Sequence, residues 1–198
     1  MAKWLTLLVL LLFVLPATAV AATVKVRVEG KTRTLFGPTE VTVTASTPLE
    51  AIQQASLLGE LYYHVTTTSF GPYVDQVGLY GGDASSGWVF KVDDASPPVG
   101  ADQVQLKDGD TVEWYYATFG ATGGPPTLVL SRVQGKCYRV VEQDDSGKTT
   151  AAVGAVIHVD GRSVETHGAT GAAATCLTGK HGLVWATLNG AVRSNRLP

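Results

Sequence analysis

Residues able to perform acid–base or nucleophilic chemistry are few and widely spaced in this sequence. The four histidines are His64, His158, His167 and His181, and none belongs to a His-x-His or His-x-x-x-His pair. A serine nucleophile needs a neighbouring base and a group that orients it, and no Gly-x-Ser-x-Gly elbow occurs. A carboxylate pair of the glycosidase kind depends on spatial separation, so the sequence leaves it open. We predict no catalytic residue and no enzyme activity.

Paired carboxylates are the next candidates, because oxygen ligands suit Ca²⁺. Three such pairs occur, and each adjoins glycine, serine or a second turn-forming residue: Asp93-Asp94, Asp108 with Asp110, and Asp144-Asp145. Asp beside such residues is also typical of turns, and this interpretation is favoured over Ca²⁺ binding. Phosphate-loop and dinucleotide fingerprints are missing as well. We therefore predict no metal ligands and no cofactor.

Aromatic side chains are the remaining functional signal. Many of them fall between residues 62 and 116, where they could form a stacking surface for a flat or sugar-like ligand. The predicted ligand-binding residues are Tyr73, Tyr80, Trp88 and Phe90. The competing interpretation is that Trp88, Phe90 and Trp114 belong to a hydrophobic core, since each alternates with neighbours of a strand-like segment.

Residues 1–22 have the pattern of a secretory signal peptide. Lys3 precedes a run from Trp4 to Leu15 that is apolar apart from Thr6, and Pro16 is followed by small residues that include Ala-x-Ala. The alternative is a membrane anchor, but a spanning helix needs roughly 20 apolar residues. We expect cleavage after Ala19, Ala21 or Ala22, no stable membrane insertion afterwards, and a secreted, extracellular or periplasmic protein.

Charge and cysteine content fit that compartment. The net charge is −2, and it becomes −3 when Lys3 leaves with the leader. No basic stripe for nucleic acid or patch for anionic lipid is present, so nucleic-acid binding is not expected. Cys137 and Cys176 are the two cysteines, and in an oxidising compartment they are expected to form a disulfide. Closing so long a loop stabilises a fold by roughly 4 kcal/mol.

The segment 23–119 predicts an α+β domain. Strand-like alternation in 23–29 is followed by a helix signal, in which Thr47 is the N-cap, Pro48 the first helical residue and Glu50 the third. Gly59 is the expected stop. Strands, one helix and further strands in this order suit a β-grasp-like domain. Residues 120–126, rich in Gly and Pro, predict a linker.

The segment 127–198 predicts an all-β domain. Asp160-Gly161 lies between two strand-like runs and favours a type I′ hairpin turn. Asn189-Gly190 predicts a second hairpin, with Ala191, Val192 and Arg193 as its returning strand. Several short strands with turns between them are typical of a β-sandwich. The predicted fold class is therefore mainly β: a β-grasp-like N-terminal domain with one helix, and a small C-terminal sandwich.

Both segments resemble known domains. The runs 71–77, 87–92, 99–102 and 107–114 resemble the domain of unknown function related to the C-terminal domain of transcobalamin and intrinsic factor. One departure is Asp93-Asp94, where that family usually has Asn-Gly. Residues 130–197 are similar to bacterial immunoglobulin-like or carboxypeptidase-regulatory-like modules, on the runs 154–162 and 182–187. These resemblances imply a fold and suggest a corrinoid-like ligand, although the helical barrel of the vitamin carriers is missing.

The functional expectation follows from these observations. We predict a secreted or cell-surface, non-enzymatic binding or adhesion protein that holds a corrinoid or other small ligand at its N-terminal loops. A protein or glycan partner at the cell surface is a second version of this hypothesis. The alternative is a structural spacer or accessory module of an envelope or extracellular assembly, without a small-molecule ligand. An exposed aromatic patch would favour binding over spacing.

Overall fold

A computed structural model of the chain describes residues 21–121, 123–166 and 173–198. Most of the expected signal peptide (residues 1–20) and His167 lie outside the described residues. Ala22, one of the three residues considered for cleavage, is buried as the first residue of a strand. Within the described segments, no helix has the length and apolarity required to cross a bilayer.

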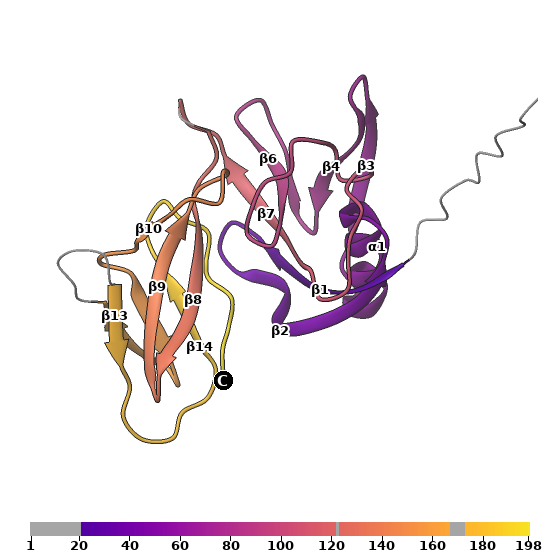
Figure 1. The fold of residues 1–198 in the computed structure, drawn as a ribbon. Helices are drawn as coiled ribbons and strands as arrows, with labels where there is room; N and C mark the ends of the chain where they lie inside the picture. The colour runs from indigo at the N-terminus through magenta and orange to yellow at the C-terminus, as the bar shows by residue number, and fades with distance from the viewer. Residues whose placement is uncertain (1–20, 122, 167–172) are drawn as a thin grey trace, which may run out of the picture.

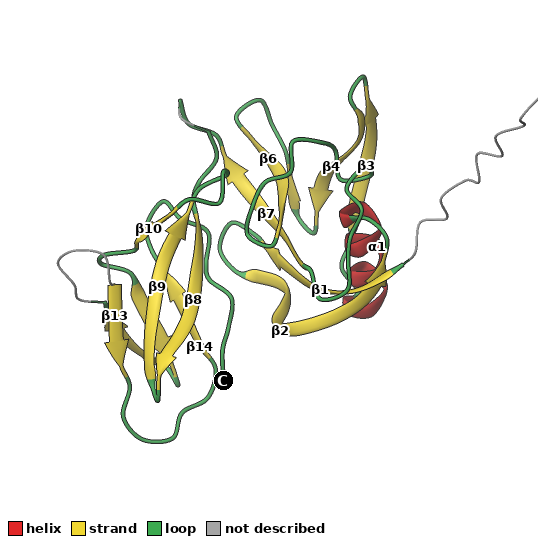
Figure 2. Ribbon diagram, viewed as in Figure 1, coloured by secondary structure: helices red, strands yellow, loops and turns green. Residues whose placement is uncertain are grey.

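The N-terminal region consists of a helix and two sheets (Figures 1 and 2). Its elements are β1 (Ala22–Glu29), β2 (Thr34–Ala45), α1 (Pro48–Gly59), β3 (Tyr63–Thr68), β4 (Gly71–Val77), β5 (Tyr80–Gly81), β6 (Ser86–Val92) and β7 (Thr111–Thr118). The larger sheet has the order β2-β1-β7-β6, in which β1 and β7 are parallel and the other pairs antiparallel. The smaller sheet has the order β3-β4-β5.

Helix α1 begins as its sequence predicts. The Thr47 side chain accepts a hydrogen bond from the Glu50 amide, and Glu50 in turn accepts from the Ser46 amide. Ala51, Ile52 and Ala55 are fully buried against the sheet. The helix ends at Gly59, but the left-handed residue that terminates it is Glu60, with φ of 51°. The predicted start is confirmed, and the terminating residue lies one position later than expected.

The C-terminal region is a sandwich of short strands. Its elements are β8 (Thr127–Gln134), β9 (Cys137–Gln143), β10 (Thr149–Ala151), β11 (Val156–Val159), β12 (Arg162–Glu165), β13 (Ala173–Cys176) and β14 (Val184–Thr187). One sheet is built on β9, which pairs with β8, β10 and β13, and the other has the order β12-β11-β14. Leu128, Tyr138, Ile157 and Val184 share its core.

Turn chemistry was predicted correctly at one hairpin of this region and wrongly at the other. Asp160 and Gly161 have φ of 47° and 72°, as a type I′ turn between β11 and β12 requires. Asn189-Gly190 does turn the chain, but no returning strand forms. Val192 instead bridges to Thr127, which opens β8. The Cys137–Cys176 disulfide is present and joins β9 to β13.

The two regions share a buried, charged junction. Alternation in β1 places Val24, Val26 and Val28 in the helix-side core, as predicted. The opposite, polar face of β1 is covered by the C-terminal region, so Arg27 and Glu29 are buried as well. Arg193 joins the regions, because its Nε lies 2.9 Å from Glu29 Oε2. The fold class is thus mainly β with one helix, as the sequence predicts.

Candidate functional site

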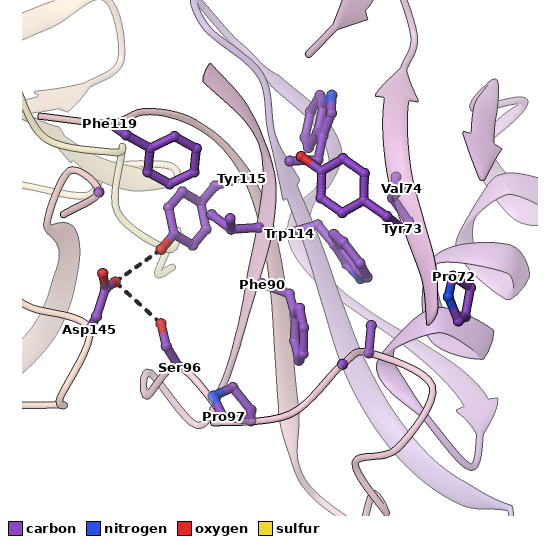
Figure 3. Close-up of a pocket in the computed structure, with 15 residues that line it drawn as sticks. Pro72, Tyr73, Val74, Phe90, Ser96, Pro97, Trp114, Tyr115, Phe119 and Asp145 are labelled. Carbon is purple, nitrogen blue, oxygen red and sulfur yellow. Dashed lines mark hydrogen bonds between the residues drawn. The ribbon is translucent and has the colours of Figure 1, made fainter. Parts of the chain in front are cut away.

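A cavity lined by aromatic side chains lies beside β6. It has a volume of about 310 Å³, and its walls come from β4, β6, β7, the loop 96–101 and three residues further along the chain. Figure 3 shows Tyr115, Phe119 and Asp145 on one side and Tyr73, Phe90 and Trp114 on the other. The full lining is Pro72, Tyr73, Val74, Trp88, Val89, Phe90, Ser96, Pro97, Gly100, Ala101, Trp114, Tyr115, Phe119, Gly124 and Asp145.

Strand alternation explains why these side chains converge. Trp88 and Phe90 share the helix-side face of β6, whereas Val89 and Lys91 share the face toward the C-terminal region. The cavity is lined from both faces, since it contacts Phe90 and Val89 together. It therefore wraps around the outer edge of β6, which is the last strand of its sheet.

Several aromatic walls are held rigidly. The Trp88 indole donates a hydrogen bond of 2.8 Å to the Tyr80 carbonyl, and the Trp114 indole donates one of 3.1 Å to the Pro48 carbonyl. The Phe90 and Trp114 rings lie 5.2 Å apart between centroids. Because the indole N–H groups already have partners, both tryptophans offer mainly apolar surface to the cavity.

Three of the four predicted ligand-binding residues line this cavity. Tyr73 is 37 % exposed, Phe90 is half-buried, and Trp88 is almost wholly buried with part of its ring on the wall. Tyr80 lies elsewhere, with its ring 6.2 Å from that of Tyr116. Trp88 therefore belongs to the core, as one interpretation held, and also to the cavity wall, while its role in ligand binding stays a prediction.

The other aromatic wall residues and the one charged wall residue described were not predicted as ligand-binding residues. Trp114 was considered a core residue, Tyr115 falls within the aromatic-rich stretch 62–116, Phe119 lies just beyond it, and Asp145 was interpreted as a turn carboxylate. The signal for Tyr115 was present, since it follows Trp114 in a strand that has aromatic residues on both faces. No sequence signal would have brought Asp145 to the same cavity, because it belongs to the other region.

Among the described residues, Asp145 is the single charged side chain on the cavity wall. Its Oδ1 accepts a hydrogen bond of 3.3 Å from the Tyr115 hydroxyl and one of 3.2 Å from the Ser96 hydroxyl. The same oxygen lies 3.8 Å from Lys91 Nζ. Burial raises the pKa of Tyr115, and burial likewise raises the pKa of Tyr73, so both hydroxyls stay neutral at physiological pH. A ligand here meets aromatic rings, neutral hydroxyls and one carboxylate.

Lys91 is fully buried next to this wall. Its Nζ donates to Thr127 Oγ1 and to the carbonyls of Gln143 and Asp144, at 3.0, 3.1 and 3.2 Å. Burial lowers the pKa of Lys91, while the Asp145 charge opposes that shift. All three hydrogen bonds cross from β6 to the C-terminal region. Lys91 therefore fixes the loop that carries Asp145 against the cavity.

A second cluster of buried charges lies in the junction between the regions. Arg27 Nη2 forms an ion pair of 2.6 Å with Glu113 Oε1, and Arg27 Nη1 lies 3.6 Å from Glu29. The ion pair lacks hydrogen-bond geometry, and neither Glu113 oxygen has a hydrogen-bond partner among the described residues. Burial raises the pKa of Glu113 to about 7, even though the Arg27 charge opposes this.

The three described histidines do not gather at the cavity. His64 pairs with Asp75 at 2.7 Å on an exposed strand, His158 stacks on Trp185, and His181 lies against Tyr138. Within the described segments, no group of three or more His, Cys, Asp or Glu side chains is arranged to hold a metal ion. Asp93 and Asp94 both have positive φ and form the turn after β6.

Comparison with known proteins yields a partial family match. The model of the Domain of unknown function (DUF4430) matches residues 49–118, about a third of the chain. The matched segment contains the cavity walls from Pro72 to Tyr115, but not Phe119, Gly124 or Asp145. No curated protein matches this sequence.

A solved structure from Ruminococcus gnavus is similar to half of the chain. It is described as that of a candidate metal-binding protein, and the alignment covers 50 % of this chain and 99 % of the other. The sequence identity is 17 % and the TM-score is 0.39. A likeness this distant does not carry the neighbour's described binding activity over to this chain.

Proposed function

We propose that this chain is an exported, non-catalytic binding protein that holds a ligand in the cavity beside β6. The observation that carries the proposal is the cavity itself, which is preformed, walled by rigid aromatic rings and provided with one carboxylate. Pockets of this size and composition are typical of binding sites for small ligands. The signal-like leader and the Cys137–Cys176 disulfide support export.

The size of the cavity limits which ligands it can enclose. A corrinoid, which the resemblance to the vitamin carriers suggests, is a large macrocycle with many amide side chains and cannot be enclosed in about 310 Å³. It could lie only across the mouth, with one edge or side chain inserted. The cavity better suits a compact aromatic or aliphatic group, either as a small molecule or as part of a larger partner.

Tryptophan fluorescence tests this proposal, because Trp88 and Trp114 both lie on the wall. The mature protein is titrated with 2-phenylethanol, cyanocobalamin and cobinamide, with inner-filter correction and calorimetry as a second readout. We expect saturable binding of at least one probe and about tenfold weaker binding by Tyr73→Ala, which corresponds to ~1.4 kcal/mol. Tyr62→Ala is the matched control, since Tyr62 is exposed in the same region and lies off the cavity.

The spacer hypothesis remains the second candidate, and the junction favours it. The buried ion pair between Arg193 and Glu29 and the hydrogen bonds from Arg27 and Lys91 hold the two regions in one orientation, as a rigid connector would require. If no probe binds and Tyr73→Ala behaves like Tyr62→Ala in every titration, the binding proposal fails and the spacer hypothesis becomes the better one.

A further inference from the structure

The outer edge of β6 has unpaired backbone groups beside the cavity. In the β6–β7 ladder, hydrogen bonds connect Phe119 N to Ser85 O and Asp93 N to Thr111 O, just beyond the two ends. Antiparallel ladders alternate bonded and non-bonded pairs. The odd-numbered residues of β6 therefore bond to β7, and the amides and carbonyls of Trp88 and Phe90 point away from it.

Both ends of this edge are already closed. At one end, the Val92 amide and carbonyl bond to Ala95. At the other, the Tyr73 hydroxyl lies against the β6 backbone at Gly87, where a Cβ built on the glycine would be 2.3 Å from it. Between them, the Phe90 amide and carbonyl and the Trp88 carbonyl have no hydrogen-bond partner among residues 21–121, 123–166 and 173–198. The open edge is thus one short segment centred on Phe90, which is itself a cavity wall.

The shape of the cavity fits what such an edge would bind. An exposed strand edge is a template for another strand. An added strand places alternate side chains on opposite faces of the sheet, and the cavity reaches both faces of β6. On one face lie Phe90, Trp114 and Tyr73, and on the other lie Tyr115, Phe119 and Asp145 (Figure 3).

We propose that the cavity receives an extended peptide segment of a partner protein, which adds as a short strand to the edge of β6 at Phe90. This inference rests on the proposed binding function and names its ligand class. The peptide residue opposite Phe90 has an apolar side chain, which packs among Phe90, Trp114 and Tyr73. Main-chain hydrogen bonds supply affinity in this mode, and the alternate side-chain pockets supply specificity.

The charge on the cavity wall determines which residue type is preferred next to the apolar peptide residue. That residue faces Tyr115 and Asp145, on the side where the described lining has one carboxylate and no cationic residue. Lys91 Nζ is turned toward three oxygen acceptors of the junction, and Asp145 Oδ2 accepts no hydrogen bond from a described side chain. Aromatic faces also attract cations. The peptide pattern is therefore a Lys or Arg beside an apolar residue.

A peptide series tests this mode directly. The probe is acetyl-Val-Lys-Phe-Lys-Val-amide, and its partners are the same peptide with an N-methylated central Phe and a version with both Lys replaced by Glu. N-methylation retains the side chains but removes one main-chain donor. We expect at least tenfold weaker calorimetric binding of both altered peptides. The N-methyl group is also placed at each neighbouring peptide residue in turn. If every N-methylated peptide binds as tightly as the parent peptide, strand addition is wrong.

The hydrogen-exchange rates of the β6 amides distinguish strand addition from side-chain contact, because side-chain contact alone would not change them. The Phe90 amide points outward and the Val89 amide is bonded to β7. On addition of the parent peptide, hydrogen exchange measured by NMR should slow at Phe90 and change little at Val89. Binding without slower exchange at Phe90 contradicts the proposal.

Two matched pairs of variants complete the test. Phe90→Pro removes the outward amide and the ring, whereas Phe90→Ala removes the ring alone, so Pro should weaken peptide binding further than Ala. An outward N–H on an edge strand is a position where proline is tolerated, and circular dichroism checks the fold. Asp145→Asn should weaken the Lys peptide about tenfold, while Glu165→Gln, an exposed charge removal on β12, should not.

The failures of the two proposals are distinguishable. If 2-phenylethanol binds in a Tyr73-dependent way but none of the peptides does, the strand-addition inference is wrong and the binding function stands. If neither peptides nor small probes bind, both proposals fail together.

Discussion

Single residues in this protein illustrate how burial overrides ordinary charge preferences. Glu113 is fully buried between the two regions, and its environment contains Arg27, Lys91, Glu29 and Asp94. Removal from water disfavours its ionised form more strongly than Arg27 favours it. Lys91, also fully buried, is instead satisfied by three oxygen acceptors. Both residues belong to strands whose sequence alone suggests a solvent-exposed polar face.

The first prediction concerns the pH dependence that Glu113 produces. Its pKa is about 7 in the folded protein and 4.5 in an unfolded chain, so the folded state binds more protons between these values. The contribution of Glu113 to the free energy of unfolding is therefore most favourable below pH 4.5. It falls as the pH rises to 7, by up to about 3 kcal/mol. Urea unfolding of the wild type and Glu113→Gln at several pH values measures this.

The variant isolates the contribution of Glu113, because the glutamine amide stays neutral. The difference in unfolding free energy between variant and wild type should grow in favour of Glu113→Gln from pH 5 to pH 7.5. A difference that stays constant with pH, or that grows in the opposite direction, contradicts the raised pKa.

Elements are positioned here by local backbone devices as much as by hydrophobic pattern. Strand β2 contains Gly37 at an irregularity of its pairing with β1, where the register shifts between Val26 and Val28. Gly37 has φ of 69°, and a Cβ at this position would lie 2.2 Å from the Val26 carbonyl oxygen. The bulge bends β2 around the sheet, and only glycine satisfies both the dihedral angle and the close backbone approach.

Substitution of Gly37 separates these two requirements. Gly109→Ala, in the turn before β7, introduces a Cβ at positive φ into open space and should cost about 1 kcal/mol. Gly37→Ala adds a clash with backbone, so its cost should be at least twice that of the control. Thermal and urea unfolding compare the two variants. Similar losses for both would show that the backbone at Gly37 relaxes.

At the scale of the whole molecule, the charged junction determines how the two regions are arranged. Arg193 reaches across it to Glu29 and to the Gly30 carbonyl, and the Arg27 guanidinium donates to the Arg193 carbonyl at 2.9 Å. These contacts join residues more than 160 positions apart in sequence. The same arrangement brings the loop of Asp145 to the cavity, so the candidate site is complete only when the regions are docked.

Removal of Arg193 tests this coupling. Arg193→Met leaves the buried Glu29 carboxylate without its cross-region partner, which should destabilise the docked state by about 3–5 kcal/mol. Hydrogen exchange should rise on both sides of the junction, and ligand titrations should weaken. Arg139→Met, at an exposed position of β9, is the control and should change neither the junction exchange nor the titrations. Unchanged exchange at the junction in Arg193→Met would show that other contacts suffice.

Much of the fold is determined by local patterns in the sequence. The start of α1 follows from Thr47, Pro48 and Glu50, since caps act within one turn. Alternation identified β1, β6 and β7, and Asp160-Gly161 identified a hairpin. The predicted second hairpin at Asn189-Gly190 was wrong because Val192 bridges to Thr127 instead, and that competition depends on a distant segment.

The candidate site was determined by the sequence only in part. Aromatic content pointed to Tyr73, Trp88 and Phe90, whose strands lie near one another in the chain. Only the tertiary structure decided that Asp145 closes the cavity, that Tyr80 packs elsewhere, and that the polar face of β1 is buried. The physical reason is that alternation along a strand predicts which residues share a face of the sheet. Which surface covers that face is determined by packing between segments that are distant in sequence.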